Sequence, residues 1–311
     1  MTLIYTAGAF GRHEVPAGHQ ERQGRYVAVE EALKAGGLDA LERREAPLVT
    51  AEAAARAHPG GYWASLEAAS PEDGLTTLDP DTFMGPHSWE ATRRAAGAAV
   101  AAVDAVMAGE ADTAFVAARP PGHHATPDTA MGFCLLNSVA IAALHAQASG
   151  AGRVAVVDFD VHHGNGTQDI LWDRPDTFFA SSHEWPQYPG TGKATERGGQ
   201  GEARNAPIPT GEGARAFRAA WAERLLPALD AFAPDLILVS AGFDAHEADP
   251  VGGLTLHEDD FDWITAEILG LARRHARGRV VSLLEGGYDL GALGRSAAVH
   301  VSRLARGPEA R

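Results

Sequence analysis

Apolar positions along the chain fall into short continuous runs, separated by Gly-, His- or Asp-rich loops and by Ala- or Leu-rich stretches. The runs predict strands at 113–118, 153–160, 177–182, 235–240 and 279–284. The Ala- and Leu-rich stretches predict helices at 88–107, 136–147, 214–232 and 257–275, and after Asp289. Continuous rather than alternating apolar runs are typical of strands covered on both faces, as in a parallel sheet. Strands that alternate with helices over this length predict a doubly wound α/β fold.

Two stretches, 57–88 and 182–213, lack such periodicity and are rich in Gly and Pro. Aromatic residues recur in both, which is unlike a linker. Long ordered loops in a compact domain usually form the rim of a binding site. No internal repeat interrupts the chain, so we expect one domain over residues 1–311.

Composition excludes several classes of protein. The chain carries 26 basic and 41 acidic side chains, a net charge of −15, and 45% hydrophobic residues. This balance argues against a disordered chain and against a nucleic-acid partner, which would need a basic surface. The longest apolar stretch, 95–108, is interrupted by Asp104, so we expect no membrane span. The N-terminus does not resemble a signal peptide, and the lone Cys134, expected to be buried, is consistent with a cytoplasmic location.

The densest cluster of chemically active residues follows the predicted strand at 153–160. Asp158, Asp160 and His162 are spaced two apart, so in an extended strand they share one face. The crevice outside the carboxyl ends of parallel strands is the usual ligand site of such a sheet. Two carboxylates that converge there repel each other unless a cation or a proton lies between them.

Three further motifs follow predicted strands. The loop after 113–118 contains His123 and His124, and an imidazole pair suits acid–base chemistry near neutral pH. Asp244 adds a carboxylate after 235–240, and Tyr288 adds a phenol that can stabilise an oxyanion after 279–284. With a single cysteine, a metal would need His and carboxylate ligands. Asp160, His162 and Asp244 supply three, which is the ligand number of a catalytic zinc site and predicts a metal-dependent hydrolase.

These motifs resemble the histone deacetylase family, in particular bacterial class II-like histone deacetylases and acetylpolyamine amidohydrolases. The motifs that carry the resemblance are Arg119-Pro-Pro-Gly-His123-His124, Gly132-Phe133-Cys134, Asp158-x-Asp160-x-His162-His163-Gly-Asn165-Gly, Tyr188-Pro-Gly-Thr-Gly, Ser240-Ala-Gly-Phe-Asp244 and Glu285-Gly286-Gly287-Tyr288. They occur in family order, and residues 13–25 are similar to the family's N-terminal loop. The resemblance implies the arginase/deacetylase α/β fold, with a central eight-stranded parallel sheet.

The resemblance also implies a role for each matching residue. Asp160, His162 and Asp244 would bind one catalytic Zn²⁺. His123 and His124 would form the catalytic dyad, oriented by Asp158 and Asn165 respectively. The carboxylate orienter raises imidazole basicity and the amide does not, so the two pKa values should differ. Tyr288 would be the oxyanion donor. The channel around the acyl chain would be formed by Phe133, Tyr188, Gly132, Gly286 and Gly287. The oxygen donors of a structural K⁺ or Na⁺ would come from Asp158, Asp160, His162, Ser181 and Ser182.

The implied reaction is hydrolysis of an N-acetyl amide on a primary amine. Polyamine-specific relatives carry an acidic gatekeeper where this chain has Val251, although Glu247 is nearby. This favours an acetylated lysine side chain over an acetylated polyamine, without excluding the latter. Two alternatives remain, a binuclear-manganese ureohydrolase of the same fold and a non-catalytic acyl-amine binder. Whether the chain forms a homo-oligomer stays open.

Four histidines lie outside these motifs, in helical or loop contexts without a sequence partner: His58, His145, His275 and His300. We expect them at the surface or at helix ends.

Overall fold

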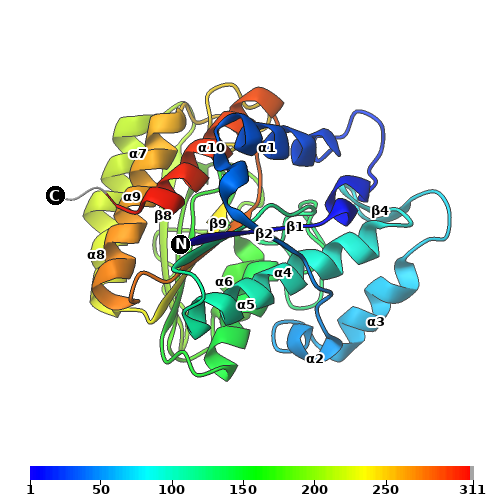
Figure 1. Cartoon of the computed structure of the whole chain (residues 1–311), viewed down its shortest axis with the longest axis horizontal. Coiled ribbons are helices and arrows are strands. Elements are labelled where there is room, and N and C mark those ends of the chain that lie inside the picture. The colour runs from blue at the N-terminus through cyan, green and yellow to red at the C-terminus, as the bar shows by residue number, and fades with distance from the viewer. Residues whose placement is uncertain (309–311) are drawn as a thin grey trace.

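The structure, a computed structural model, describes residues 1–308 and is built around an eight-stranded parallel sheet (Figure 1). The strand order is β2-β1-β5-β10-β9-β6-β7-β8, and every neighbouring pair is parallel. The strands are β1 Thr2–Thr6, β2 Glu42–Glu45, β5 Thr113–Val116, β6 Val154–Asp158, β7 Thr177–Trp185, β8 Glu202–Pro209, β9 Leu236–Ala241 and β10 Val280–Leu284. An antiparallel hairpin, β3 Thr76–Asp79 and β4 Thr82–Met84, stands apart from this sheet.

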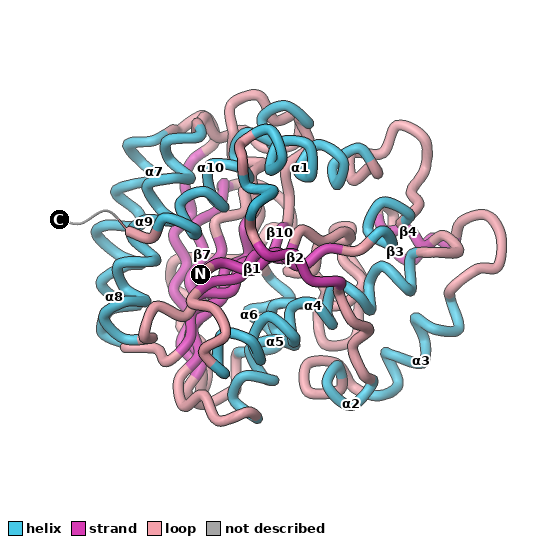
Figure 2. The backbone as a smooth tube through the Cα atoms, viewed as in Figure 1, coloured by secondary structure: helices cyan, strands magenta, loops and turns pink. Residues whose placement is uncertain are grey.

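Helices cover both faces of the sheet (Figure 2). One face carries α4 Ser88–Ala108 and α5 Ser138–Ala148, with α2 Ala51–Ala54 packed against α5 and α3 Gly60–Ala69 next to α2. The other carries α1 Gly24–Ala35, α7 Ala214–Ala220, α8 Leu226–Phe232, α9 Glu258–His275 and α10 Leu290–Arg306. Short elements complete the chain: the 3₁₀ helices η1 Gly8–Arg12 and η2 Leu38–Ala40, helix α6 Asn165–Leu171 and the π-helical turn η3 Trp221–Leu225.

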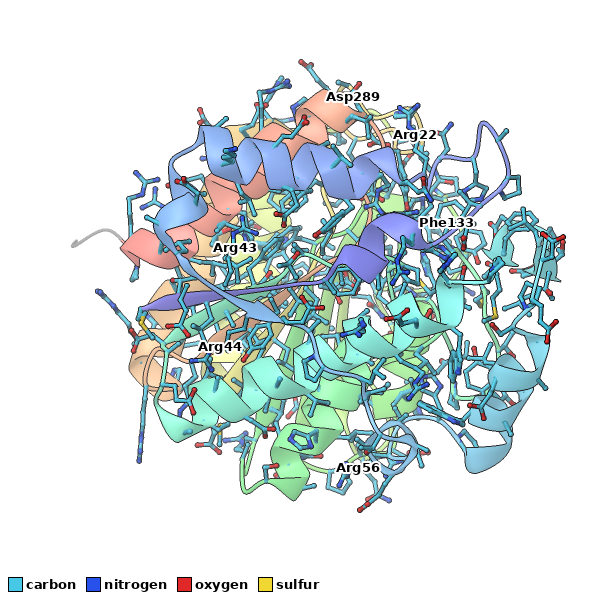
Figure 3. All side chains as sticks on the ribbon, turned by 45° about the vertical axis from the view of Figure 1, so that its right-hand side comes forward. Arg22, Arg43, Arg44, Arg56, Phe133 and Asp289 are labelled. Atoms are coloured by element: carbon cyan, nitrogen blue, oxygen red, sulfur yellow. The ribbon has the colours of Figure 1, made fainter. Side chains whose placement is uncertain are left out.

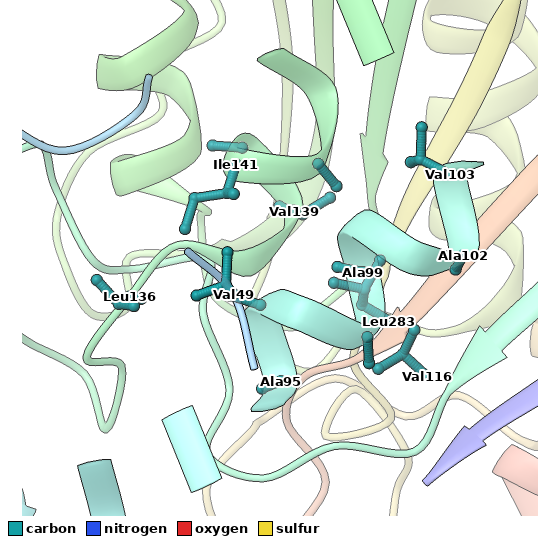
Figure 4. Packing of buried hydrophobic residues seen from close by; sticks show 14 of the residues in the cluster. Val49, Ala95, Ala99, Ala102, Val103, Val116, Leu136, Val139, Ile141 and Leu283 are labelled. Carbon is teal, nitrogen blue, oxygen red and sulfur yellow. The ribbon is translucent and has the colours of Figure 1, made fainter. Parts of the chain in front are cut away.

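The continuous apolar runs produce a core on each side of the sheet. In β6, Val154 and Val156 join one cluster of buried residues, whereas Ala155 and Val157 join the other. Successive side chains of a strand point to opposite faces, so a strand between two helical layers must be apolar throughout. Figure 4 shows the α4 side of the sheet, where small alanines of the helix let it approach Val116 and Leu283 closely.

Most predicted elements are confirmed to within a few residues. The predicted helix at 214–232 is interrupted, because it consists of α7, η3 and α8. Pro227 lies in the first turn of α8. It has no N–H to donate to a carbonyl in the preceding turn, which explains why regular α-helical bonding fails there.

The sequence pattern missed the sheet edges and the structure inside the two irregular stretches. Strand β2 consists of polar residues, and β8 mixes buried positions with partly and fully exposed ones, so neither gives a continuous apolar run. Both are edge strands, which face solvent on one side. The stretch 57–88 contains α3 and the β3–β4 hairpin.

Of the two positions expected for His58 and His300, the surface or a helix end, the surface is excluded. Both are buried, at 1% and 0% exposure. The ring of His300 bridges Thr265 Oγ1, at 2.7 Å, and Ser282 Oγ, at 2.8 Å, so α9, β10 and α10 meet at one hydrogen-bonded imidazole. Hydrogen bonds of this kind compensate the burial of a polar ring. Among residues 1–308, no helix has both the length and the apolar character needed to cross a membrane.

Candidate active site

The motifs that carry chemistry follow four strands that are neighbours in the sheet. Strands β5, β10, β9 and β6 lie side by side and run parallel, so the loops after them meet at one edge. The predicted convergence is therefore present. Figure 3 brings this side of the molecule forward, with Phe133 of the loop after β5 below Asp289 at the start of α10.

The three predicted metal ligands lie together at this edge. One ligand atom each from Asp160, His162 and Asp244 falls within 4.8 Å of the others. His162 Nδ1 lies 3.1 Å from Asp160 Oδ1 and 3.2 Å from Asp244 Oδ2. Strand β6 ends at Asp158, so Asp160 and His162 reach this point through the loop and not through strand alternation as expected.

The cluster fits a divalent cation. Oδ2 of Asp244 is buried, and no group in the described part of the chain donates a hydrogen bond to it. Burial and the nearby charge of Asp160 raise the pKa of Asp244 to about 7. Burial alone would lower the pKa of His162, but Asp160 and Asp244 outweigh it and raise that pKa to about 10. The three side chains thus favour a positive charge between them, and carboxylate and imidazole are ligands of zinc.

Two glycines leave space around the carboxylates. A Cβ at Gly242 would lie 2.0 Å from Asp160 Oδ2, and one at Gly286 would lie 2.0 Å from Asp244 Oδ2. Gly286 N–H also donates to Asp160 Oδ2 at 2.8 Å. A side chain at either position would displace the ligand oxygens.

A second group of potential ligands, His246, His257 and Glu258, lies at the start of α9. It fits a metal less well. Nδ1 of His246 accepts the N–H of Ala248, so in the neutral ring the proton is on Nε2, the nitrogen nearest the Glu258 carboxylate. Glu258 is also paired with Arg295 at 2.5 Å.

The two catalytic candidates His123 and His124 lie beside the ligand cluster, with ring centres 4.0 Å apart. His123 Nδ1 donates to Asp158 Oδ2 at 2.9 Å, and His124 Nδ1 donates to Asn165 Oδ1 at 2.8 Å. Nδ2 of Asn165 donates elsewhere, which identifies its oxygen as the acceptor. Nε2 of a neutral His124 therefore carries a lone pair and can accept a proton.

The pKa values of the two imidazoles differ, as predicted, and they move in opposite directions. Burial lowers the pKa of His123, but the charges of Asp158 and Asp160 outweigh it and raise that pKa well above its usual value. Burial, together with the charges of His123 and His162, holds the pKa of His124 well below its usual value. Titratable groups whose environments separate their pKa values are typical of acid–base sites.

Tyr288 lies at the end of a short glycine loop. Gly287 has a φ of +122°, a conformation that side chains rarely adopt, and this turns the chain before the tyrosine. Asp249 Oδ2 accepts the N–H of Tyr288 at 2.6 Å. Burial raises the pKa of Tyr288 well above its usual value, although Arg25 opposes this, so the phenol keeps its proton.

Aromatic rings surround the ligand cluster. The ring centre of Tyr188 lies 5.1 Å from that of His124, and the ring centre of Phe133 lies 5.7 Å from that of Tyr288. Phe133 has a φ of +68°, and its N–H donates to Thr82 Oγ1 of the β3–β4 hairpin at 3.0 Å. Gly132 packs so closely against His124 that a Cβ would lie 2.4 Å from the imidazole.

The candidates for a structural monovalent cation lie at the end of β6, in the loop after it, and in the middle of β7. Asp158 and Ser181 are register partners on these strands. The hydroxyl of Ser182 accepts the N–H of Trp221 at 2.9 Å, and Ser181 Oγ is bonded to His183 Nδ1 at 2.9 Å.

Sequence reasoning missed several residues that support the site. Glu21 and Arg25 are buried and joined at 2.9 Å, and Glu21 also binds Arg119 at 2.6 Å. Their spacing of four residues was the available signal. Asp249 and the side chain of Glu285 gave no such signal, because their partners lie far away in sequence.

Comparison with known proteins identifies relatives along nearly the whole chain. The sequence profile of the histone deacetylase domain matches residues 19–304. A histone deacetylase-like amidohydrolase of Pseudomonas aeruginosa is 42% identical, with 92% of this chain and 77% of the relative covered. Histone deacetylase 14, chloroplastic, of Arabidopsis thaliana is 39% identical, with 95% and 75% covered.

The crystal structure of the HDA15 HD domain superposes with a TM-score of 0.91 at 34% identity. The superposition covers 98% of this chain and 88% of the HDA15 HD domain. The likeness, with the eight-stranded parallel sheet, confirms the expected arginase/deacetylase fold.

Proposed function

This chain belongs to the histone deacetylase family, and on that basis we propose that it is a zinc-dependent hydrolase of N-acetylated primary amines, acting on acetyl-lysine side chains of proteins or peptides. Membership in the family supports deacetylase or amidohydrolase activity in general. The observation that carries the finer proposal is the cluster of Asp160, His162 and Asp244 beside two imidazoles with separated pKa values.

In this proposal Asp160, His162 and Asp244 hold one Zn²⁺, which when bound acts as a Lewis acid and makes a coordinated water more acidic. Two carboxylates and a neutral imidazole balance the charge of a divalent ion. Gly242 and Gly286 keep the space around the two carboxylates open.

The imidazole pair moves the protons. His124 accepts a proton from the attacking water at Nε2, because its Nδ1–H is bound to Asn165. Asp158 accepts the Nδ1–H of His123, so in this proposal that proton points away from the reacting atoms. A proton from the dyad then goes to the nitrogen of the leaving amine, giving acetate and a free amine.

Tyr288 is assigned the role of hydrogen-bond donor to the carbonyl oxygen, where negative charge develops. Its hydroxyl remains protonated at neutral pH because of its raised pKa. Phe133 and Tyr188, with Gly132, Gly286 and Gly287, are assigned to the walls of the channel for the acyl-lysine chain.

We extend the proposal to a structural K⁺ or Na⁺ held chiefly by backbone oxygens of Asp158, Asp160, His162, Ser181 and Ser182. Oxygen donors suit these hard cations. One continuous sheet with a core on each face supports treating residues 1–311 as a single deacetylase domain.

The substrate preference is supported by the loop after Asp244. Val251 stands where polyamine-specific relatives are expected to carry a carboxylate, and the exposed Glu247 lies near His257, with 3.5 Å between Oε1 and Nδ1. Asp249, the buried acid of this loop, already accepts the N–H groups of Val251 and Tyr288, so neither acid stands at the position of Val251 to bind a second amine.

The test is to load the purified protein with one equivalent of Zn²⁺ and supply an acetyl-lysine peptide and N⁸-acetylspermidine separately. We expect faster release of acetate from the peptide. Faster hydrolysis of acetylspermidine would reassign the enzyme to acetylpolyamines, and hydrolysis of neither substrate would refute the proposed activity. Asp160→Asn, which removes a ligand charge, should abolish turnover in the same assay.

A further inference from the structure

A buried carboxylate, that of Glu285, connects two loops of the candidate active site with strand β9. The residue is 1% exposed and directly follows β10. Its Oε2 accepts the N–H of Gly122 at 2.6 Å and that of His123 at 3.2 Å. Its Oε1 accepts Ser240 Oγ–H at 3.1 Å. One side chain thus binds the loop after β5 and the end of β9.

The main chain of the same residue is fixed on the other side. Its N–H donates to Ala241 O at 3.0 Å, and its carbonyl accepts a hydrogen bond from Arg25 Nη2. The two residues that follow are also held, because Gly286 N–H binds Asp160 and Gly287 O accepts from Arg25 Nε at 2.6 Å. Residue 285 is therefore the connection between the imidazole loop and the phenol loop.

A carboxylate at this position is unfavourable for packing alone. In the described part of the chain no arginine or lysine is paired with the Glu285 side chain, and Asp158 and Asp160 lie close enough to repel it. Burial raises its pKa to about 7. The positive charge of a protonated His123 opposes this rise but does not outweigh burial. Burying an acid lowers stability relative to an apolar side chain, so its two acceptor oxygens point to a positional role.

We propose that Glu285 is a positioning residue for deacetylation: by binding two successive backbone N–H groups, its carboxylate sets where His123 lies relative to Tyr288. The inference rests on the proposed function. His123 is the residue that bears the second N–H, so a shift of this backbone moves its imidazole directly. Misplacement of a catalytic group by about 1 Å can lower the rate about 100-fold.

Two conservative variants separate reach from charge. Glu285→Gln keeps the length of the side chain and one acceptor oxygen, which can face the Gly122 and His123 amides while its NH₂ faces Ser240. Glu285→Asp keeps the negative charge but is one methylene shorter, so it cannot bridge to the loop. If the length of the side chain is what matters, Glu285→Gln should be active and Glu285→Asp should not. An electrostatic effect on the imidazoles predicts the reverse.

The experiment measures kcat and KM of the zinc-loaded enzyme on the acetyl-lysine peptide. We expect Glu285→Gln to keep kcat within about threefold of wild type, and Glu285→Asp to lower kcat about 100-fold with little change in KM. An equal loss of kcat in both variants, or a greater loss in Glu285→Gln, would overturn the inference.

Hydrogen exchange gives a second readout that does not need turnover. Residues 120 and 121 are prolines without an N–H, so a peptide spanning residues 120–125 reports on Gly122, His123 and the two residues after them. Exchange in this peptide should accelerate in Glu285→Asp and stay slow in Glu285→Gln. Unchanged exchange in Glu285→Asp would refute the positioning role of Glu285, even if the wild-type enzyme were inactive. Inactivity of the wild-type enzyme on both substrates would refute the proposed function separately.

Discussion

The guanidinium of Arg25 lies 4.9 Å above the ring centre of Tyr288 and donates from Nε to Gly287 O at 2.6 Å. Arg25 comes from α1, whereas Tyr288 lies in the loop after β10. The arginine is fully buried and is held in place by Glu21. A planar side chain that binds two carbonyls and covers one aromatic face therefore fixes both the loop and the ring of the proposed oxyanion donor.

Replacing Arg25 by Lys should lower kcat about 10- to 100-fold, because an ammonium cannot reproduce the planar contacts and the phenol loop gains freedom. The matched control is Arg22→Lys on the exposed neighbouring arginine, which should leave kcat unchanged. Both variants should bind one equivalent of zinc, measured by atomic emission. Full activity of Arg25→Lys would contradict the proposed role of the guanidinium.

Replacing Tyr288 by Phe should lower kcat about 100- to 1000-fold, because it removes one donor to the developing oxyanion and leaves the ring contacts in place. The metal content and the melting temperature should stay at wild-type values, since the hydroxyl does not touch the three ligand side chains in the proposed arrangement. Wild-type turnover in this variant would assign the oxyanion contact to another group.

The sequence predicted which motifs meet, because the carboxyl ends of parallel strands share an edge and each motif directly follows an apolar run. It did not predict how Asp160 and His162 are aimed, since β6 stops at Asp158 and the loop directs the later side chains. That depends on where strand pairing ends, which is a tertiary property.

The supporting residues were less predictable still. Glu285 binds Gly122 across 163 positions, and Arg25 binds Gly287 across 262. A hydrogen bond to a backbone amide demands no particular residue type from its partner, so the sequence holds no matching signal. His300 was unpredictable for another reason, because its hydroxyl partners on α9 and β10 come close to it only after the layers are assembled.

Asp244→Asn should reduce zinc affinity strongly, because it removes one ligand charge and a buried oxygen to which none of residues 1–308 donates a hydrogen bond. The expected result is less than one zinc per chain after dialysis, together with a lower melting temperature at limiting zinc, since bound metal stabilises the folded state. Glu247→Gln, a neutralised acid in the same loop but exposed, should retain its metal. Equal zinc content in the two variants would exclude Asp244 as a ligand.

The buried His300 should make the protein less stable in acid. Burial lowers its pKa in the folded state to about 3, against about 6.5 in an unfolded chain. The unfolded state therefore binds a proton first, and stability falls as the pH drops from about 6.5 toward 3. Between pH 6.5 and 5 this one group should contribute about 2 kcal/mol.

The measurement is the free energy of unfolding in urea at pH 7 and pH 5, for wild type and for His300→Gln. A glutamine keeps a donor and an acceptor for the two hydroxyls but does not titrate. The difference in the free energy of unfolding between pH 7 and pH 5 should be about 2 kcal/mol smaller in the variant, whatever its stability at pH 7. An unchanged difference would show that other groups control the acid transition.

Glu21→Gln should destabilise the fold more than any surface charge change, because it leaves two buried guanidiniums without their carboxylate. Burial opposes ionisation of Glu21, but Arg119, His13 and Arg25 outweigh it and hold its pKa far below the usual value. Removing one partner of a buried ion pair typically lowers stability by about 3–5 kcal/mol. Glu110→Gln breaks the exposed pair with Arg44 and should lower it by less than about 1 kcal/mol. Urea unfolding at pH 7 compares them directly, and a small effect in Glu21→Gln would mean that water or other carbonyls solvate the two arginines.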